Sequence, residues 1–163
     1  MKKMNNKGFS LVELIIVIAI MAILIVVLAP QYLKYVERSR NSTDLQTATE
    51  FMDAIEVYAA DPEAADPFVD GDTFTIVSTT GNPGLISGSA GSKAEDALDS
   101  TGLTPADFEC QSRTAWSIMG LTGTVQSDGS IEWQASDDGT FAASMGITDT
   151  FTASYTPPTP PGP

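Results

Sequence analysis

The sequence predicts an α+β fold in which one long N-terminal α-helix packs on a small antiparallel β-sheet, and three observations support this. The run Leu14–Ala29 contains no charged or polar side chain. The stretch Leu45–Ala59 repeats apolar residues at helical spacing. After Thr73 the chain changes to short alternating segments separated by turn residues, which is typical of strands. A sheet with one apolar face must bury that face, and the helical stripe offers a partner.

The first half of the helix is a candidate membrane span. Phe9–Ala29 is 21 residues long, and at about 1.5 Å per residue it crosses the roughly 30 Å hydrocarbon core of a bilayer. Glu13 is the exception in this segment, because a charge in a membrane helix costs about 2.5–3.5 kcal/mol on insertion scales. Glu13 lies only about 6 Å along the axis from Phe9, close to the headgroups, which lowers that cost. An ionisable residue in such a segment indicates a functional site.

The helix is expected to continue through Pro30 to about Ala60. Pro30 lacks an amide donor and crowds the preceding turn, so a kink or local loosening is expected there. The mostly polar stretch Gln31–Asp44 follows. An apolar stripe with steps of three and four residues then comprises Leu45, Ala48, Met52, Ile55 and Ala59. Asp61-Pro62 ends the helix, because the residue before a proline avoids the helical region.

The stripe defines an apolar side and a polar side on this half of the helix. Phe51 and Tyr58 are expected at its margin, whereas Glu50 and Asp53 fall on the opposite side. The first half of the helix has only lipid or other helices to pack on. The second half therefore carries the contact with a soluble domain.

The rest of the chain predicts short helices and strands joined by loops. Pro62–Gly71 is an acidic, turn-rich loop, and Thr80–Ser92 is a loop rich in glycine and serine. Short helices are expected over Lys93–Ser100 and from Thr104-Pro105 through Glu109, where a threonine cap precedes a proline. The expected strands are Thr73–Ser78, Thr114–Met119, Gly123–Ser127, Ser130–Ala135, Thr140–Met145 and Thr150–Tyr155.

Turn signals join the later strands into an antiparallel meander. Asp128-Gly129 is a two-residue hairpin signal, and Asp137-Asp138-Gly139 joins the next pair of strands. Residues 157–163 contain five prolines, cannot pair in a sheet and are expected to form an extended tail. The carboxylates of Asp70-Gly71-Asp72 and Asp137-Asp138-Gly139 offer the oxygen ligands that Ca²⁺ prefers, but the spacing of an EF-hand is absent, so turn chemistry is the favoured interpretation.

Composition excludes several function classes. The chain has 163 residues and a net charge of −13, so a phosphate backbone would repel it and nucleic acid is not an expected partner. It contains no histidine and one cysteine, Cys110. Histidine-dependent nucleophile pairs, Cys/His zinc sites and an intramolecular disulfide are therefore excluded. Cys110 is expected to be buried as a small apolar residue. No enzymatic activity, metal site or cofactor is expected.

The N-terminal residues resemble the prepilin signal of type IV pilins. In that family a short basic leader ends in glycine and is followed by phenylalanine, a small hydroxyl residue, two apolar residues and glutamate. The matching residues here are Lys2, Lys3, Lys7, Gly8, Phe9, Ser10, Leu11, Val12 and Glu13. Pro30 matches a proline that many members carry near the end of the apolar run. The resemblance covers roughly residues 1–60, and type IV pilins have the fold predicted above.

The resemblance implies a structural subunit that is processed and then polymerised. Prepilin peptidase would cut between Gly8 and Phe9, and the new α-amine of Phe9 would be N-methylated. Removal of the leader takes away three of the eight basic side chains and leaves a net charge of −16. Glu13 would pair with the α-amine of a neighbouring subunit, since opposite charges attract strongly in an apolar core. Pro30 would serve assembly.

The resemblance also implies partners, locations and a division of the chain. The partners are further copies in a helical homopolymer, the peptidase, the pilus assembly machinery, and the inner or cytoplasmic membrane before assembly. The protein would be a single-pass membrane protein first and an extracellular pilus on the cell surface afterwards. The expected segments are the leader 1–8, the membrane-spanning or filament-core half-helix 9–30, the amphipathic half-helix 31–61, the globular head 62–156 and the tail 157–163.

Two other interpretations stay open. A pseudopilin of a type II secretion or competence system shares the same signal, and a long acidic domain with a proline-rich tail mildly favours a surface pilus. A monomeric, membrane-anchored binding protein would keep its leader and stay in the membrane fraction. Filaments visible on cells, and the state of the N-terminus, would separate these interpretations.

Overall fold

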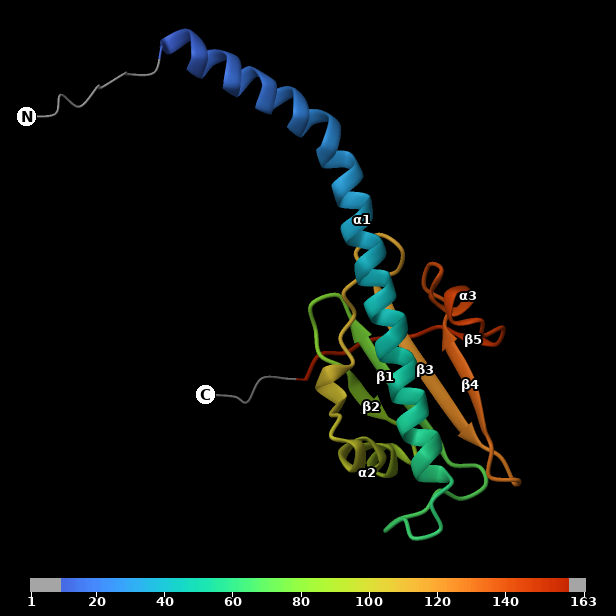
Figure 1. The fold of residues 1–163 in the computed structure, drawn as a ribbon. Coiled ribbons are helices and arrows are strands. Elements are labelled where there is room, and N and C mark those ends of the chain that lie inside the picture. Colours follow the sequence, from blue (N-terminus) through green and yellow to red (C-terminus); the bar gives the residue numbers. More distant parts are fainter. Residues whose placement is uncertain (1–9, 159–163) are drawn as a thin grey trace, which may run out of the picture. The chain divides into compact units, whose positions relative to one another are not determined.

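The computed structural model describes residues 10–158 (Figure 1). The chain divides into two compact units, Met1–Arg38 and Ser39–Pro163, which share one helix, α1 (Leu11–Ala59). The helix ends directly before the predicted stop at Asp61-Pro62, and Phe9, its predicted first residue, lies outside the described residues. The long N-terminal helix of the predicted fold class is thus confirmed.

The first unit contributes only helix to the described structure. From Ser10 to Tyr35 every residue is exposed. The helix passes Pro30 without interruption. Its first part is long and apolar enough to cross a membrane, judged by length and composition, and none of that part is buried within the subunit. The kink or local loosening expected at Pro30 does not end the helix. The loss of helical hydrogen bonds expected before Pro30 in a packed filament stays a prediction.

The second unit contains a five-stranded sheet in the order β2-β1-β3-β4-β5. The strands are β1 (Thr73–Thr79), β2 (Leu85–Ser87), β3 (Ile118–Val125), β4 (Ile131–Ser136) and β5 (Thr150–Phe151). All neighbours are antiparallel except β4 and β5, which are parallel. The predicted meander is therefore wrong at its end, while the mostly antiparallel sheet is confirmed.

Several strand predictions differ from the structure. Thr114–Met119 and Gly123–Ser127 were expected as separate strands, but Ile118–Met119 and Gly123–Val125 belong to the single strand β3, which pairs with both β1 and β4, and residues 114–117 are not in a strand. The loop expected over Thr80–Ser92 contains the short edge strand β2 and the start of a helix. A hairpin at Asp128-Gly129 joins β3 and β4 as predicted, but its loop is longer than two residues, because the last strand pair is Val125 with Ile131. Gly129 adopts a positive φ of 84° and donates its N–H to Gln126.

Short helices complete the head. Helix α2 (Gly91–Thr101) confirms the predicted Lys93–Ser100 and extends it. At Thr104-Pro105 the expected start is confirmed, but only a 3₁₀ turn, η1 (Pro105–Asp107), follows it, and Asp107 bonds back to Thr104. Thr140–Met145 was predicted as a strand and is instead helical, as α3 (Phe141–Met145).

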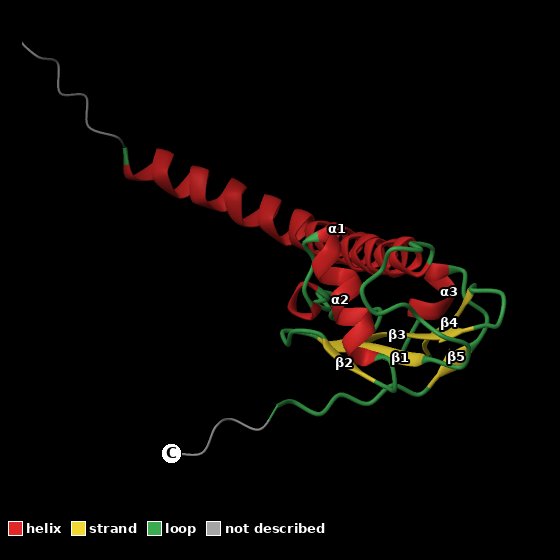
Figure 2. Ribbon diagram, turned by 90° about the horizontal axis from the view of Figure 1, so that it is seen from below, coloured by secondary structure: helices red, strands yellow, loops and turns green. Residues whose placement is uncertain are grey.

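The core of the head lies between the second half of α1 and one face of the sheet (Figure 2). The helix buries Ala48, Phe51, Ala54, Ile55 and Tyr58. Phe51 and Tyr58, expected at the margin of the stripe, are therefore central to the contact, whereas Leu45, Met52 and Ala59 are only half-buried. Glu50 and Asp53 are exposed, as predicted. The stripe is rotated by part of a turn from its predicted centre, but it covers the sheet as expected.

Glycines allow aromatic rings to lie close to the sheet. A Cβ at Gly123 would meet the ring of Phe74 at 2.3 Å, and one at Gly120 would meet the ring of Phe151 at 3.1 Å. Phe74 lies on the core face, whereas the chain around Phe151 covers the opposite face, so the two glycines of β3 serve packing on both sides of the sheet.

Candidate assembly site

The carboxylate of Glu13 caps the N-terminus of α1. Glu13 lies in the first helical turn, and its Oε2 accepts the backbone N–H of Ser10 at 2.9 Å. A carboxylate near the first turn satisfies an amide that has no partner within the helix and lies at the positive end of the helix dipole. The predicted scissile bond, Gly8–Phe9, lies outside the described residues.

The helix that follows Glu13 presents apolar side chains on all sides. From Leu11 to Leu28 the large apolar side chains are 47–74% exposed. Water solvates such a surface poorly, because each buried CH₂ is worth about 0.8 kcal/mol. By length and composition this part of the helix could cross a membrane, and none of it is buried within the described residues.

The head is fixed to α1 by a buried carboxylate, Asp44. Its side chain is fully buried, with Oδ1 accepting the N–H of Gln111 at 2.8 Å. Its Oδ2 accepts the N–H of Ser112 at 2.9 Å and the indole N–H of Trp116 at 2.8 Å. The thiol of Cys110 donates weakly to the same oxygen at 3.8 Å. A charged acceptor makes such bonds stronger than neutral ones, so Asp44 fastens the 110–116 segment to the helix.

The sequence analysis did not single out Asp44. It placed this residue at the end of a polar stretch, although Asp44 precedes Ala48 by four residues and so lies on the same helical face as the stripe. A carboxylate at a stripe position is the signal that would have indicated a buried, bonded acid.

Cys110 is buried, as predicted. Burial raises the pKa of its thiol to about 11, because removal from water penalises the thiolate. The nearby carboxylate of Asp44 acts in the same direction. Cys110 is therefore a packed thiol in the subunit core and not a nucleophile.

Two of the aspartates proposed as alternative calcium ligands, Asp72 and Asp138, accept hydrogen bonds from other groups of the head. Asp72 accepts the N–H of Val69 at 2.9 Å, within its turn, and the ammonium of Lys93 at 2.8 Å, and the bond from Lys93 lowers the pKa of Asp72. Asp138 accepts from the backbone of Ile118 at 2.7 Å and from the hydroxyl of Ser117 at 2.9 Å, which join its loop to the start of β3. The bond of Asp72 to Val69 fits the turn interpretation. Within residues 10–158, no group of three acidic or cysteine side chains is placed to hold a metal ion.

The fold and the N-terminal motif together define a pilin-like protein. Residues 3–29 match the family described as the prokaryotic N-terminal methylation motif. Fimbrial protein EcpC of Eikenella corrodens is 33% identical over 149 residues, which cover 85% of this chain and 87% of that protein. A type IV major fimbrial protein FimA of Dichelobacter nodosus is 31% identical over 158 residues, covering 89% of this chain and 92% of that protein. Another FimA of that organism is 26% identical over 150 residues, 91% of this chain and 95% of that protein. No solved structure matches the chain.

The chain belongs to the type IV fimbrial proteins, the type IV pilins. Members of this family are structural subunits and not enzymes. The resemblance stated from the residues alone is confirmed, and the similarity extends through the head, well beyond the N-terminal 60 residues.

Proposed function

We propose that this chain is made as a membrane-bound precursor, cut between Gly8 and Phe9, methylated on the new α-amine of Phe9, and polymerised into an extracellular type IV pilus. Segment 1–8 is then the leader, 9–30 the membrane span and later the filament core, 31–61 the helix that carries the head, 62–156 the head and 157–163 the tail. Assembly machinery extracts each subunit from the cytoplasmic or inner membrane.

One observation carries this proposal: an apolar helix with no cover of its own directly follows a processing motif and continues into a folded head. The side chains from Leu11 to Leu28 remain exposed in the single subunit. A bilayer covers them before assembly, and the same segments of neighbouring subunits cover them afterwards. Because the head packs only on the second half of α1, the first half is available for both environments.

Glu13 determines how subunits lock together in this proposal. In the single subunit its carboxylate accepts the N–H of Ser10. Removal of the leader creates an α-amine on Phe9 that is largely protonated at neutral pH. In the filament, Glu13 takes this amine from a neighbouring subunit, and each charge then relieves the burial cost of the other. The pairing fixes how far each subunit rises along the filament.

Pro30 serves the same assembly step. In a membrane the helix stays continuous around it, as in the described structure, because neighbouring groups satisfy the carbonyl that proline leaves without a donor. In the filament, close packing of helices about one axis favours a joint, so helical hydrogen bonds are lost within one or two turns before Pro30.

Replacement of Glu13 tests the proposal. Glu13→Gln keeps an oxygen acceptor for the Ser10 N–H but removes the charge, and Glu13→Val removes both. Both variants should insert into membranes and be processed, whereas the yield of sheared filaments should fall sharply. Glu13→Asp keeps the charge with a shorter reach and should assemble partially. Normal filament yield from processed Glu13→Val would contradict the role of Glu13.

A pseudopilin of a secretion or competence system is the second candidate. It shares the N-terminal motif. The relatives that match over most of the chain are fimbrial proteins, which favours the surface pilus. Electron microscopy of cells separates the two, because only the pilus gives long filaments containing this chain.

A further inference from the structure

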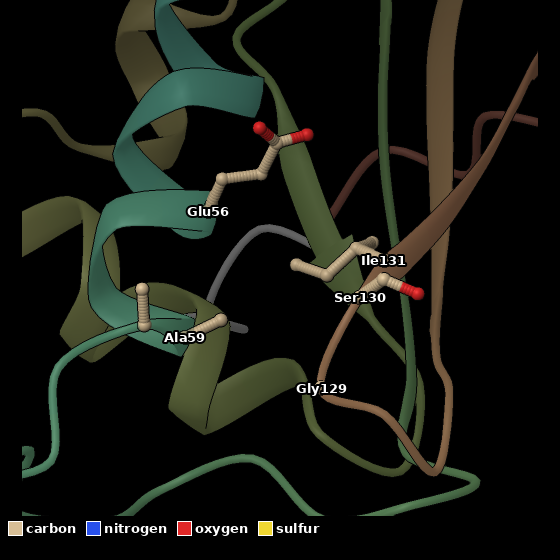
Figure 3. A pocket seen from close by; sticks show the side chains of 6 residues that line it. Glu56, Ala59, Gly129, Ser130 and Ile131 are labelled. Atoms are coloured by element: carbon tan, nitrogen blue, oxygen red, sulfur yellow. The ribbon is translucent and has the colours of Figure 1, made fainter.

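The head carries an amphipathic cleft at the C-terminal end of α1. It is about 270 Å³ in volume and is lined by Glu56, Ala59, Ala60, Gly129, Ser130 and Ile131. In Figure 3, Glu56 and Ala59 on the helix face Ile131 on β4 across the cleft. Its size is slightly below that of pockets for drug-sized ligands, so it suits a single side chain.

The chemistry of this cleft fits a long cationic side chain. Ile131 and the alanines form an apolar wall, and the exposed carboxylate of Glu56 lies at one edge. The indole N–H of Trp133 donates to Glu56 Oε1 at 2.8 Å and holds this carboxylate in place. The last turn of α1 has no basic residue, so the negative end of the helix dipole is not neutralised there by the helix itself.

The cleft also lies in an acidic neighbourhood. Asp61 lies two residues after the end of α1, and Asp128 lies in the hairpin that forms the other wall. Asp128 accepts both the N–H and the hydroxyl of Ser130, and these bonds lower the pKa of Asp128 and keep it ionised. A guanidinium placed in the cleft would meet the carboxylate of Glu56, and the nearby Asp61 and Asp128 would add further negative charge.

The complementary group lies at the opposite end of the same head. Asp44 fastens the backbone of Gln111 and Ser112 to α1, and the exposed Arg113 follows these two residues directly in the chain. From Asp44 to Glu56 the helix rises about 18 Å, beyond the reach of an arginine side chain. Arg113 therefore meets this cleft only on another molecule.

We propose that the cleft receives the guanidinium of Arg113 from a second copy of this chain, with the arginine stem on Ile131 and the guanidinium at Glu56. Arginine has five donors, so this contact is compatible with the interactions that Arg113 makes within its own subunit. In the proposed filament the helices run parallel, so the cleft of one head meets the Arg113 end of the next. The contact is then heterologous, and it can repeat along an open assembly instead of closing as a dimer. The inference rests on the proposed polymerisation and names one contact between heads.

Matched glutamine variants test the contact. Glu56→Gln removes the charge but keeps an oxygen for the Trp133 indole, and Arg113→Gln removes the cation. Glu50→Gln is the control, because Glu50 is an exposed carboxylate on the same helix, bonded to Gln46. The rate of subunit release from sheared, washed filaments is measured in detergent at low and high salt. Thermal unfolding of the full-length subunit in detergent reports on the fold itself.

Each single variant should release subunits about tenfold faster at low salt, a size typical of a close interfacial charge pair. The double variant should be no faster than either single one, and high salt should bring the wild type close to the variants. The charge-swapped pair Glu56→Arg with Arg113→Glu should recover slow release, even if Glu56→Gln also affects the fold. Three results would overturn the contact. Glu56→Gln could release subunits no faster than Glu50→Gln, or Glu56→Gln could have an effect while Arg113→Gln has none. The effects of the two single variants could also multiply in the double variant. Absence of wild-type filaments would refute the proposed function itself.

Discussion

Replacement of Asp44 should loosen the head from its helix. Asp44→Asn keeps the shape of the side chain but has one acceptor oxygen. If that oxygen accepts from Ser112 and from the indole of Trp116, the amide NH₂ faces the N–H of Gln111, and two donors then meet with no acceptor between them. At least one charge-assisted hydrogen bond is then lost and one buried donor is left without an acceptor, which costs about 1.5–3 kcal/mol. Asp44→Ala removes every acceptor contact of this side chain and leaves several buried donors unpaired, so it should cost about 3–5 kcal/mol.

The assay is thermal unfolding of the full-length subunit in detergent, followed by tryptophan fluorescence, since Trp116 is itself a partner of Asp44. A loss of about 2 kcal/mol corresponds to a fall in Tm of roughly 8 °C for a head of this size. Asp53→Asn is the control, because Asp53 is an exposed carboxylate on the same helix and its change should stay within about 0.5 kcal/mol. A shift for Asp44→Asn as small as that for Asp53→Asn would refute the anchoring role.

Two further predictions concern Cys110 and Asp138. Because burial raises the Cys110 pKa to about 11, a thiol reagent at pH 8 should label the folded subunit far more slowly than the unfolded chain. A reducing agent should not shift the Tm of the monomer. Rapid labelling of the folded protein would contradict this burial. For Asp138, burial alone would raise the pKa, but hydrogen bonds from Ser117 and Ile118 outweigh it and lower the pKa below the usual 3.8. Its contribution to stability is therefore present at neutral pH and lost as the pH falls through the folded-state pKa, so the Tm difference between wild type and Asp138→Asn should shrink below about pH 4. A difference that stays constant from pH 7 to pH 3 would show that the Asp138 charge does not stabilise the turn.

The sequence was most informative where local signals decide the structure. Asp61-Pro62 stops a helix through backbone sterics alone, and α1 ends at Ala59. The alternation in Thr73–Ser78 predicts a strand and matches β1, which buries Phe74 and Ile76 in the core. Asp128-Gly129 indicates a turn, and a hairpin forms there with a positive φ at the glycine, although its loop is longer than two residues.

The wrong strand predictions concern segments whose secondary structure depends on contacts with residues that are distant in the sequence. Thr114–Met119 and Gly123–Ser127 were predicted as separate strands, yet β3 runs from Ile118 to Val125 without a break, and the rings of Phe151 and Phe74, distant in sequence, lie against its Gly120 and Gly123. Thr140–Met145 was predicted as a strand. Its alanines favour a helix, and Gly146, with a φ of 74°, ends that helix.

The residues of the candidate site divide in the same way, into those that a local motif reveals and those whose role depends on distant contacts. Gly8, Phe9 and Glu13 were found through the order and spacing of a short motif. Asp44 was missed because its role depends on Trp116 and on a loop more than 60 residues away, which spacing along the chain does not reveal. The cleft at Glu56 was likewise beyond prediction, because it joins the end of α1 to a hairpin about 70 residues later.

Mass spectrometry of filaments sheared from the cell surface tests the central claim most directly. The account predicts a major species that begins at Phe9, carries one added methyl group at its N-terminus and contains the rest of the chain through the head. The same filaments should contain no species that retains Met1–Gly8. Intact precursor in the filaments, or a protein found only in the membrane fraction while the surface filaments consist of other chains, would contradict the account.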